Sequence, residues 1–168
     1  MWAYSPTLLL CILDSRGLGT LKKTDIMAKF ILCDTATPDH GKTQTLLKVI
    51  EKLKLMFAPE KDEPTTGVDR YASFQIDGKR IVVNTMGDPI PEFEKYLMQA
   101  VEEDAKVIIC ASRTGGNTFE EINRLDDNYK IIRFSNFYST SDNPLFKPYL
   151  LDDMAQAIVQ LALKLLAL

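Results

Sequence analysis

Cysteine and histidine are scarce in this sequence, and neither is placed as a metal site would need. The 168 residues include three cysteines, Cys11, Cys33 and Cys110, and one histidine, His40. The cysteines are odd in number and far apart, which argues against a disulfide framework or a cysteine-based metal site. They fit reduced thiols of a cytoplasmic protein, with Cys33 and Cys110 in expected core strands. His40 falls within a polar loop, where a solvated side chain is the simplest interpretation.

Strong charge and long hydrophobic runs are also lacking. The formal net charge is −3, which gives no support for nucleic acid or a membrane surface as a partner. The apolar run over residues 8–13 is far shorter than the ~20 residues that cross a bilayer. No basic segment precedes this run and no cleavage site follows it, so we expect no signal peptide.

The length and composition fit one soluble domain with a sizeable core. Hydrophobic residues make up 46% of the chain and charged residues 26%. We expect residues 27–168 to form this domain, because a strand pattern begins directly after Met27. Residues 1–26 do not match the rest and are interpreted as an N-terminal appendage. The alternative is an extra strand or helix packed on the edge of the sheet.

Residues 29–47 are the most informative stretch of the chain. Residues 30–33 form an all-apolar run, which is typical of a parallel strand buried on both faces. Pro38, Asp39 and Gly41 then supply turn chemistry. Apolar residues next recur at helical spacing, which predicts a helix directly after the turn; they are Leu46, Leu47, Ile50, Leu53 and Phe57.

This strand, loop and helix carry a phosphate-binding pattern. The pattern is G-x-x-x-x-G-K-[ST], except that Ala36 stands at the first glycine. Backbone N–H groups at a helix start suit a polyphosphate, Lys42 would reach its terminal phosphates, and Thr43 would bind Mg²⁺. The alternative is an ordinary turn with Lys42 in solvent. The expected nucleotide-binding residues of this segment are Ala36, Thr37, Pro38, Asp39, His40, Gly41, Lys42, Thr43 and Gln44.

The rest of the chain alternates between strands and helices. Asp77-Gly78 predicts a hairpin that joins strands 71–76 and 79–85, so these two strands should be antiparallel. Residues 58–71 are polar and read as a long loop. Further elements are expected as a helix after Pro89, a strand over 107–111, a helix capped by Thr118 and Glu121, a strand over 130–134, and a final helix capped by Asp152 or Asp153.

These elements predict an α/β fold, with a three-layer α-β-α sandwich around a mostly parallel five-stranded sheet that has one antiparallel hairpin strand. Ligands of such sheets bind outside the carboxyl ends of the strands. That rule gathers four polar or glycine-bearing loops at one rim, namely residues 34–43, 84–88, 112–117 and 135–138.

The chain resembles small P-loop NTPases and is similar to Ras-like GTPases in element order. The resemblance covers roughly residues 29–122. It implies that a threonine of the loop before the hairpin, Thr65 or Thr66, touches Mg²⁺; we choose Thr66. It also implies a D-x-x-G whose glycine is Gly87, but Asn84 replaces the aspartate. We therefore assign the acidic metal partner, and a catalytic role, to Asp88.

The guanine-reading N-K-x-D of those GTPases is absent, which favours ATP over GTP. Residues 111–118 read A-S-R-T-G-G-N-T, similar to a stretch in uncharacterised bacterial ATP/GTP-binding proteins. In that segment Arg113, Gly115 and Gly116 would clasp an anion through a guanidinium and backbone N–H groups. A glycine-rich turn with a surface arginine is the alternative. The expected catalytic residues are Lys42, Arg113 and Asp88.

Three functions remain open from the sequence. The first is a nucleoside-triphosphatase that uses Mg²⁺ and ATP (or GTP) and couples a loop rearrangement to an unknown protein partner. Such chemistry depends on positioning and electrostatics more than on covalent steps. The second is a small-molecule or nucleotide kinase, in which Arg113 grips the transferring phosphoryl group. The third is a non-enzymatic nucleotide-sensing module, which Asn84 and Ala36 favour.

Overall fold

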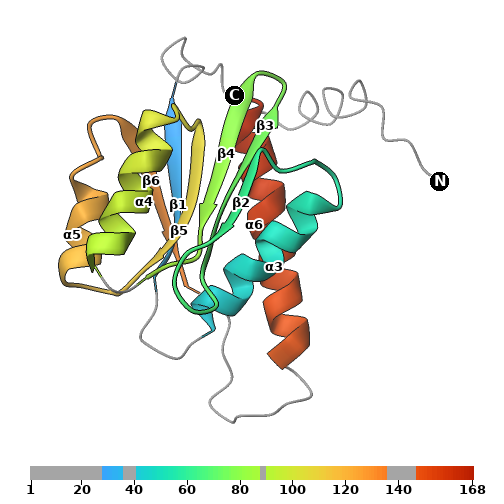
Figure 1. Ribbon diagram of the computed structural model, residues 1–168, viewed down its shortest axis with the longest axis horizontal. Helices are drawn as coiled ribbons and strands as arrows, with labels where there is room; N and C mark the ends of the chain where they lie inside the picture. The colour runs from blue at the N-terminus through green and yellow to red at the C-terminus, as the bar shows by residue number, and fades with distance from the viewer. Residues whose placement is uncertain (1–27, 36–40, 88–89, 136–146) are drawn as a thin grey trace, which may run out of the picture.

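The computed structural model describes residues 28–35, 41–87, 90–135 and 147–168, and these form a single mixed sheet with helices packed on it (Figure 1). The described part contains six strands and four helices. The strands are β1 Lys29–Thr35, β2 Lys61–Pro64, β3 Arg70–Ile76, β4 Lys79–Asn84, β5 Val107–Ser112 and β6 Tyr129–Phe134. The helices are α3 Lys42–Lys54, α4 Ile90–Glu102, α5 Asn117–Asn123 and α6 Lys147–Leu166.

The sheet has the strand order β2-β3-β4-β5-β1-β6. Strand β1 pairs in parallel with both β5 and β6, and β4 pairs in parallel with β5. Strand β3 is antiparallel to its neighbours β2 and β4. The carboxyl ends of β1, β4, β5 and β6 therefore meet at one edge, the lower edge in Figure 1. The predicted α/β class and mostly parallel sheet are confirmed.

The predicted hairpin at Asp77-Gly78 is also confirmed. Asp77 and Gly78 both have positive φ, 50° and 77°. Two consecutive left-handed residues are what a tight two-residue turn between antiparallel strands requires. The turn closes the pairing of Ile76 with Lys79.

The sheet has six strands rather than the five expected, because the presumed loop over residues 58–71 contains β2. This short edge strand pairs Lys61 with Ser73 and Pro64 with Arg70. Its Asp62 accepts two hydrogen bonds from Arg70, at 2.8 and 2.6 Å, and pairs with Lys54 of α3. Charged residues and a proline are tolerated on an edge strand, where no further strand must be paired. Strand β2 was not predicted because its sequence lacks alternating apolar residues.

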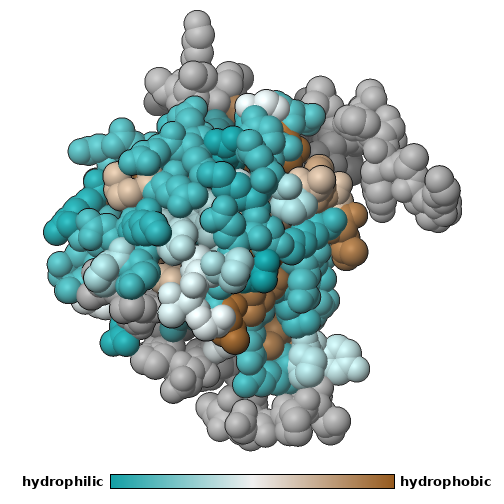
Figure 2. Space-filling view, in the orientation of Figure 1, coloured by the Kyte–Doolittle hydropathy of each residue, from teal (hydrophilic) through white to brown (hydrophobic). Residues whose placement is uncertain are grey.

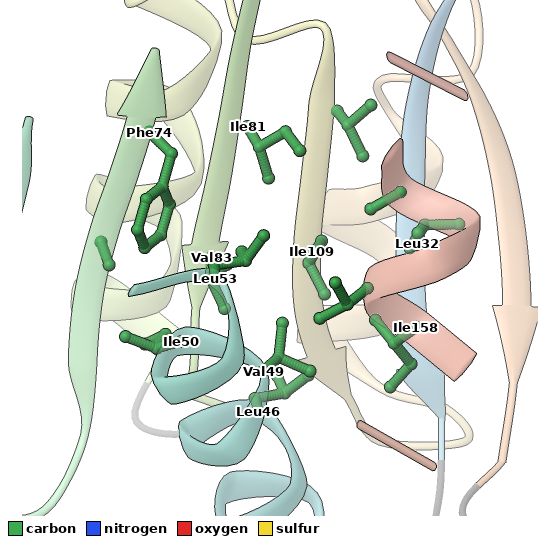
Figure 3. Close-up of a cluster of buried hydrophobic side chains, with 14 of the residues drawn as sticks. Leu32, Leu46, Val49, Ile50, Leu53, Phe74, Ile81, Val83, Ile109 and Ile158 are labelled. Carbon is green, nitrogen blue, oxygen red and sulfur yellow. The ribbon is translucent and has the colours of Figure 1, made fainter. Parts of the chain in front are cut away.

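Helices α3 and α6 cover one face of the sheet. The apolar stripe of α3 meets strand residues such as Phe74, Val83 and Ile109, and Ile158 of α6 packs beside them (Figure 3). Val49 and Leu53 of α3 are fully buried. This packing fixes the axis of α3, and with it the position of its N-terminus at the carboxyl edge of the sheet.

Helices α4 and α5 cover the opposite face (Figure 1). Phe93 and Leu97 of α4 and Ile122 of α5 pack there against Ile31 of β1 and Ile108 of β5. Both faces of β1 and β5 are therefore buried, as the apolar run over residues 30–33 predicts.

Two helix starts differ from the sequence prediction. Helix α5 is capped by Gly116 without a side-chain hydrogen bond, so the expected capping box of Thr118 and Glu121 is wrong. Helix α6 begins at Lys147, ahead of Asp152 and Asp153, so neither aspartate caps it. In both cases a polar pattern inside the helix resembled a cap, and Asp152 instead pairs with Lys52 of α3 at 3.0 Å.

The face seen in Figure 2 is largely hydrophilic, with hydrophobic side chains only in small patches. Among the described residues, no helix combines the length and apolar character that crossing a membrane requires. Cys33 and Cys110 are buried and free, as predicted, while Cys11 lies outside the described residues. The large hydrophobic side chains that remain exposed are Leu55, Met56, Val68, Met98 and Tyr149.

Phe74 tests the packing between the sheet and α3. Its side chain is fully buried on β3, whereas its neighbour Gln75 is exposed. We expect Phe74→Ala to lower the free energy of unfolding by about 3–5 kcal/mol, because it removes apolar burial and leaves a cavity. The control Gln75→Ala should change it by less than ~0.5 kcal/mol. Urea unfolding of both variants measures the difference, and equal effects would contradict this packing.

Candidate functional site

The carboxyl ends of β1 and β5 form the switch point of the sheet. These strands are adjacent, with Thr35 opposite Ser112. The chain leaves β1 for α3 on one face and leaves β5 for α5 on the other. Connections that diverge to opposite faces open a crevice between the two strand ends, where ligands of α/β sheets bind. The ends of β1 and β5 therefore flank this crevice.

Gly41 starts α3 at this crevice in a left-handed conformation. Its φ is 76°, and a Cβ placed on it would lie 3.1 Å from Leu151 Cδ2. The first intrahelical bond runs from Thr45 N to Gly41 O at 2.9 Å. Among the described residues no side chain caps this end of α3, and its first turn contains no acidic residue. The N–H groups of that turn lack intrahelical acceptors, so this end of α3 suits an anion.

Three predicted ligands lie in the first turn of α3. Lys42 and Thr43 are half-buried, and Gln44 is exposed. Several other predicted residues fall outside the described residues, so the structure says nothing of them. They are Ala36, Thr37, Pro38, Asp39 and His40 of the first loop, and Asp88 after β4.

Asp69 is a carboxylate beside this site, and the sequence reasoning missed it. The Thr85 hydroxyl donates a hydrogen bond to it at 3.0 Å, and the Thr43 hydroxyl lies close enough to influence its pKa. Burial raises the pKa of Asp69 above its usual value, and the two hydroxyl donors oppose that rise. Asp69 directly precedes β3, and because β3 is antiparallel to β4 its amino end reaches the carboxyl rim. The predicted antiparallel hairpin was therefore the signal that could have placed Asp69 at this rim.

The two threonines of the preceding loop differ in exposure. Thr66, the predicted metal ligand, has an exposed side chain, and its carbonyl accepts a hydrogen bond from Asp69 N at 3.0 Å. Thr65 N donates to Asp69 O at 2.9 Å, and Thr65 Oγ1 is buried without a hydrogen-bond partner among the described residues. A buried hydroxyl without a partner is costly. By this measure Thr65 is the better placed of the two for a ligand.

Asn84 lies on the other side of the sheet from Thr43. It is fully buried, and its Oδ1 accepts a hydrogen bond from Met86 N at 3.1 Å. Its neighbour Val83 packs toward α3 and α6, so the alternation of a strand turns Asn84 toward α4. Gly87 is half-buried, and a Cβ on it would make only an ordinary 3.9 Å contact with Ala111.

The loop after β5 is exposed and locally braced. Arg113 is exposed, its N–H points to Thr118 Oγ1 at 3.4 Å, and its carbonyl accepts a hydrogen bond from Ser112 Oγ at 2.9 Å. Gly115 and Gly116 are exposed, and Gly116 has a φ of 84°. The structure thus brings the predicted Arg113 and both glycines to the same rim of the sheet as Gly41.

Two buried cysteines, Cys33 and Cys110, lie on the face of the sheet that α4 and α5 cover. Cys33 and Cys110 face each other across β1 and β5, and Cys33 Sγ lies 3.2 Å from Ser112 Oγ and 3.8 Å from Arg133 Nη1. A hydrogen bond with Cys110, aided by Ser112, Thr35 and the Arg133 charge, lowers the pKa of Cys33 to about 6 despite its burial. The same pairing raises the pKa of Cys110. These contacts connect β1, β5 and β6 near their carboxyl ends, on the face that α4 and α5 cover.

The donor atoms at the site fit Mg²⁺. No group of three or more histidine, cysteine or acidic side chains suited to a metal occurs in the described ranges. Mg²⁺ in phosphate sites needs no such group, because it is bound through one or two protein oxygens, several waters and the phosphates of the ligand. The Thr43 hydroxyl and the Asp69 carboxylate supply hard oxygens of this kind.

Comparisons with protein-family models, with curated proteins and with solved structures found no match to this chain.

Gly41 gives a stability test of the turn that opens α3. We expect Gly41→Ala to lower the free energy of unfolding by roughly 1–2 kcal/mol, because a left-handed backbone is unfavourable for any residue with a Cβ. The added methyl group would also press on Leu151.

Gly115→Ala is the matched control, because a Cβ at Gly115 meets nothing within 4 Å and its φ is not positive. It should leave stability nearly unchanged. Equal stability of the two variants in chemical unfolding would contradict the strained turn at Gly41.

Proposed function

We propose that this chain is a P-loop nucleoside-triphosphatase with a three-layer α-β-α domain, and that it binds and hydrolyses ATP, or less readily GTP, with Mg²⁺. One observation carries the proposal. A left-handed glycine starts a helix at the switch point of the sheet, and the two residues that follow it are Lys42 and Thr43. This is the arrangement in which backbone N–H groups, a lysine and a hydroxyl serve one polyphosphate.

Each residue has a separate task in this proposal. The first-turn amides of α3 and the Lys42 ammonium hold the phosphates, and the Thr43 hydroxyl binds the metal. Arg113 lies on the opposite edge of the crevice, where its guanidinium would neutralise charge that develops on the transferring phosphoryl group. Bound Mg²⁺ would supply further neutralisation of phosphate charge.

Base preference follows from what the chain lacks. The guanine-reading N-K-x-D is absent after β5 and β6, so guanine has no sequence-evident partner. ATP is therefore proposed ahead of GTP, and a thermal-shift panel of nucleotides would rank them.

A nucleotide-sensing module is the second candidate function. The observation that favours it is Asn84, a neutral side chain that stands where Ras-like enzymes have an aspartate and whose Oδ1 is already engaged by Met86 N. A protein of this kind would bind Mg·ATP with the same residues but release little phosphate.

Lys42 tests the phosphate site directly. Mg·ATP at about 100 times its Kd should stabilise the wild-type chain by about 2.7 kcal/mol, seen as a raised melting temperature. We expect Lys42→Ala to lose this shift and to melt like the wild type without ligand, because Lys42 lies outside the two hydrophobic clusters.

The control is Lys48→Ala on the same helix, where the ammonium lies 3.9 Å from Asp152. It should keep the full ligand shift. If Lys42→Ala keeps the shift as well, the proposed phosphate site is wrong. Phosphate release, measured with and without small-molecule and nucleotide acceptors, then separates a hydrolase from a kinase and from a sensing module.

A further inference from the structure

Asp69, the residue directly before β3, is held in place by backbone and side-chain hydrogen bonds. Its backbone is fixed by two hydrogen bonds, Thr65 N to Asp69 O and Asp69 N to Thr66 O. The next residue, Arg70, exchanges two hydrogen bonds with Thr85, through its N–H at 2.9 Å and its carbonyl at 3.0 Å. The carboxylate is thus a fixed part of the sheet rim rather than a free loop side chain.

The partners of this carboxylate are hydroxyl groups. Thr85 donates to it at 3.0 Å, the Thr43 hydroxyl lies beside it, and within the described residues no lysine or arginine pairs with it. The adjacent Arg70 is engaged instead with Asp62, at 2.6 Å. A half-buried negative charge satisfied only by neutral donors costs free energy that a cation would recover. The site therefore favours a positively charged ligand next to Asp69.

The Thr43 hydroxyl links this carboxylate to the proposed phosphate site. A hydroxyl has one proton to donate and two lone pairs to offer. When this proton is turned toward the neighbouring Asp69 carboxylate, the lone pairs are directed away from it. They are then available to a cation, and the negative charge of Asp69 makes the oxygen a better ligand for one.

We propose that Asp69 is the acidic residue that positions Mg²⁺ at Thr43, in place of Asp88 or Asn84. This inference rests on the proposed nucleotide binding at α3. It assigns the metal partner to the strand that precedes the hairpin, whereas the sequence pattern looked for it after β4. Asn84 is excluded from this role by its orientation toward α4, and Thr85, the next residue, contributes by holding Asp69.

The test is the Mg²⁺ dependence of binding a fluorescent ATP analogue. In Asp69→Asn, which keeps the shape and removes the charge, binding with EDTA should equal or exceed that of the wild type. The Mg²⁺ concentration for half-maximal enhancement of binding should rise about 10- to 100-fold, the usual loss when a residue that orients a metal ligand is removed. Mn²⁺ titration followed by electron paramagnetic resonance gives a second readout that does not depend on turnover.

Asp153→Asn is the matched control, since Asp153 is an exposed aspartate on α6. It should keep the wild-type Mg²⁺ dependence. Thr85→Val is a second variant that loosens Asp69 without changing it, and it should shift the Mg²⁺ requirement in the same direction by a smaller factor. Apo melting curves verify that each variant is folded.

Two failures can be told apart. If the wild type binds no nucleotide with or without Mg²⁺, the proposed function fails and this inference fails with it. If the wild type binds with Mg²⁺ and folded Asp69→Asn shows the same Mg²⁺ dependence, only the assignment of Asp69 is overturned. If only Asp88→Asn raises the Mg²⁺ concentration needed for binding, the assignment of Asp69 is also overturned and the role returns to Asp88.

Discussion

The parallel pairing of β1 with β5 is the constraint on which the rest of the structure depends. The pairs run from Phe30 with Val107 to Thr35 with Ser112, and the paired segments are buried on both faces. Register is strongly specified when both faces are buried, because a slip by one residue would exchange the two sets of side chains. The register sets the end of β1, at Thr35, level with the end of β5, at Ser112.

The site itself combines rigid elements with short-range electrostatics. Packing of α3 and α6 on the sheet fixes the helix end, the left-handed Gly41 turns the chain into it, and the Thr85 hydroxyl holds the Asp69 carboxylate beside Thr43. Phosphoryl transfer needs positioned charges and little covalent chemistry from the protein, so such an arrangement would suffice. The sheet brings three charged residues to one edge, and they are Lys42 after β1, Asp69 before β3 and Arg113 after β5.

The sequence predicted those features that depend on local patterns. Apolar runs identified β1 and β5, Asp77-Gly78 identified the hairpin, and the glycine, lysine and threonine at 41–43 identified the start of α3. It failed where tertiary context decides the outcome. Strand β2 forms because its backbone pairs with β3 and its charges pair with α3, and neither effect leaves an apolar pattern. Asp69 could not be assigned to the site without knowing that β3 runs antiparallel to β4, since in sequence it lies far from Thr43.

The most direct test of the account is a crystal structure of the chain with Mg²⁺ and a non-hydrolysable ATP analogue. The account predicts that the phosphates lie against the backbone N–H groups at the start of α3, with Lys42 on the terminal phosphates. The metal should lie about 2.0–2.1 Å from Thr43 Oγ1, the distance that Mg²⁺ requires. Phosphates bound elsewhere on the sheet, or a bound nucleotide with no contact to α3, would contradict it.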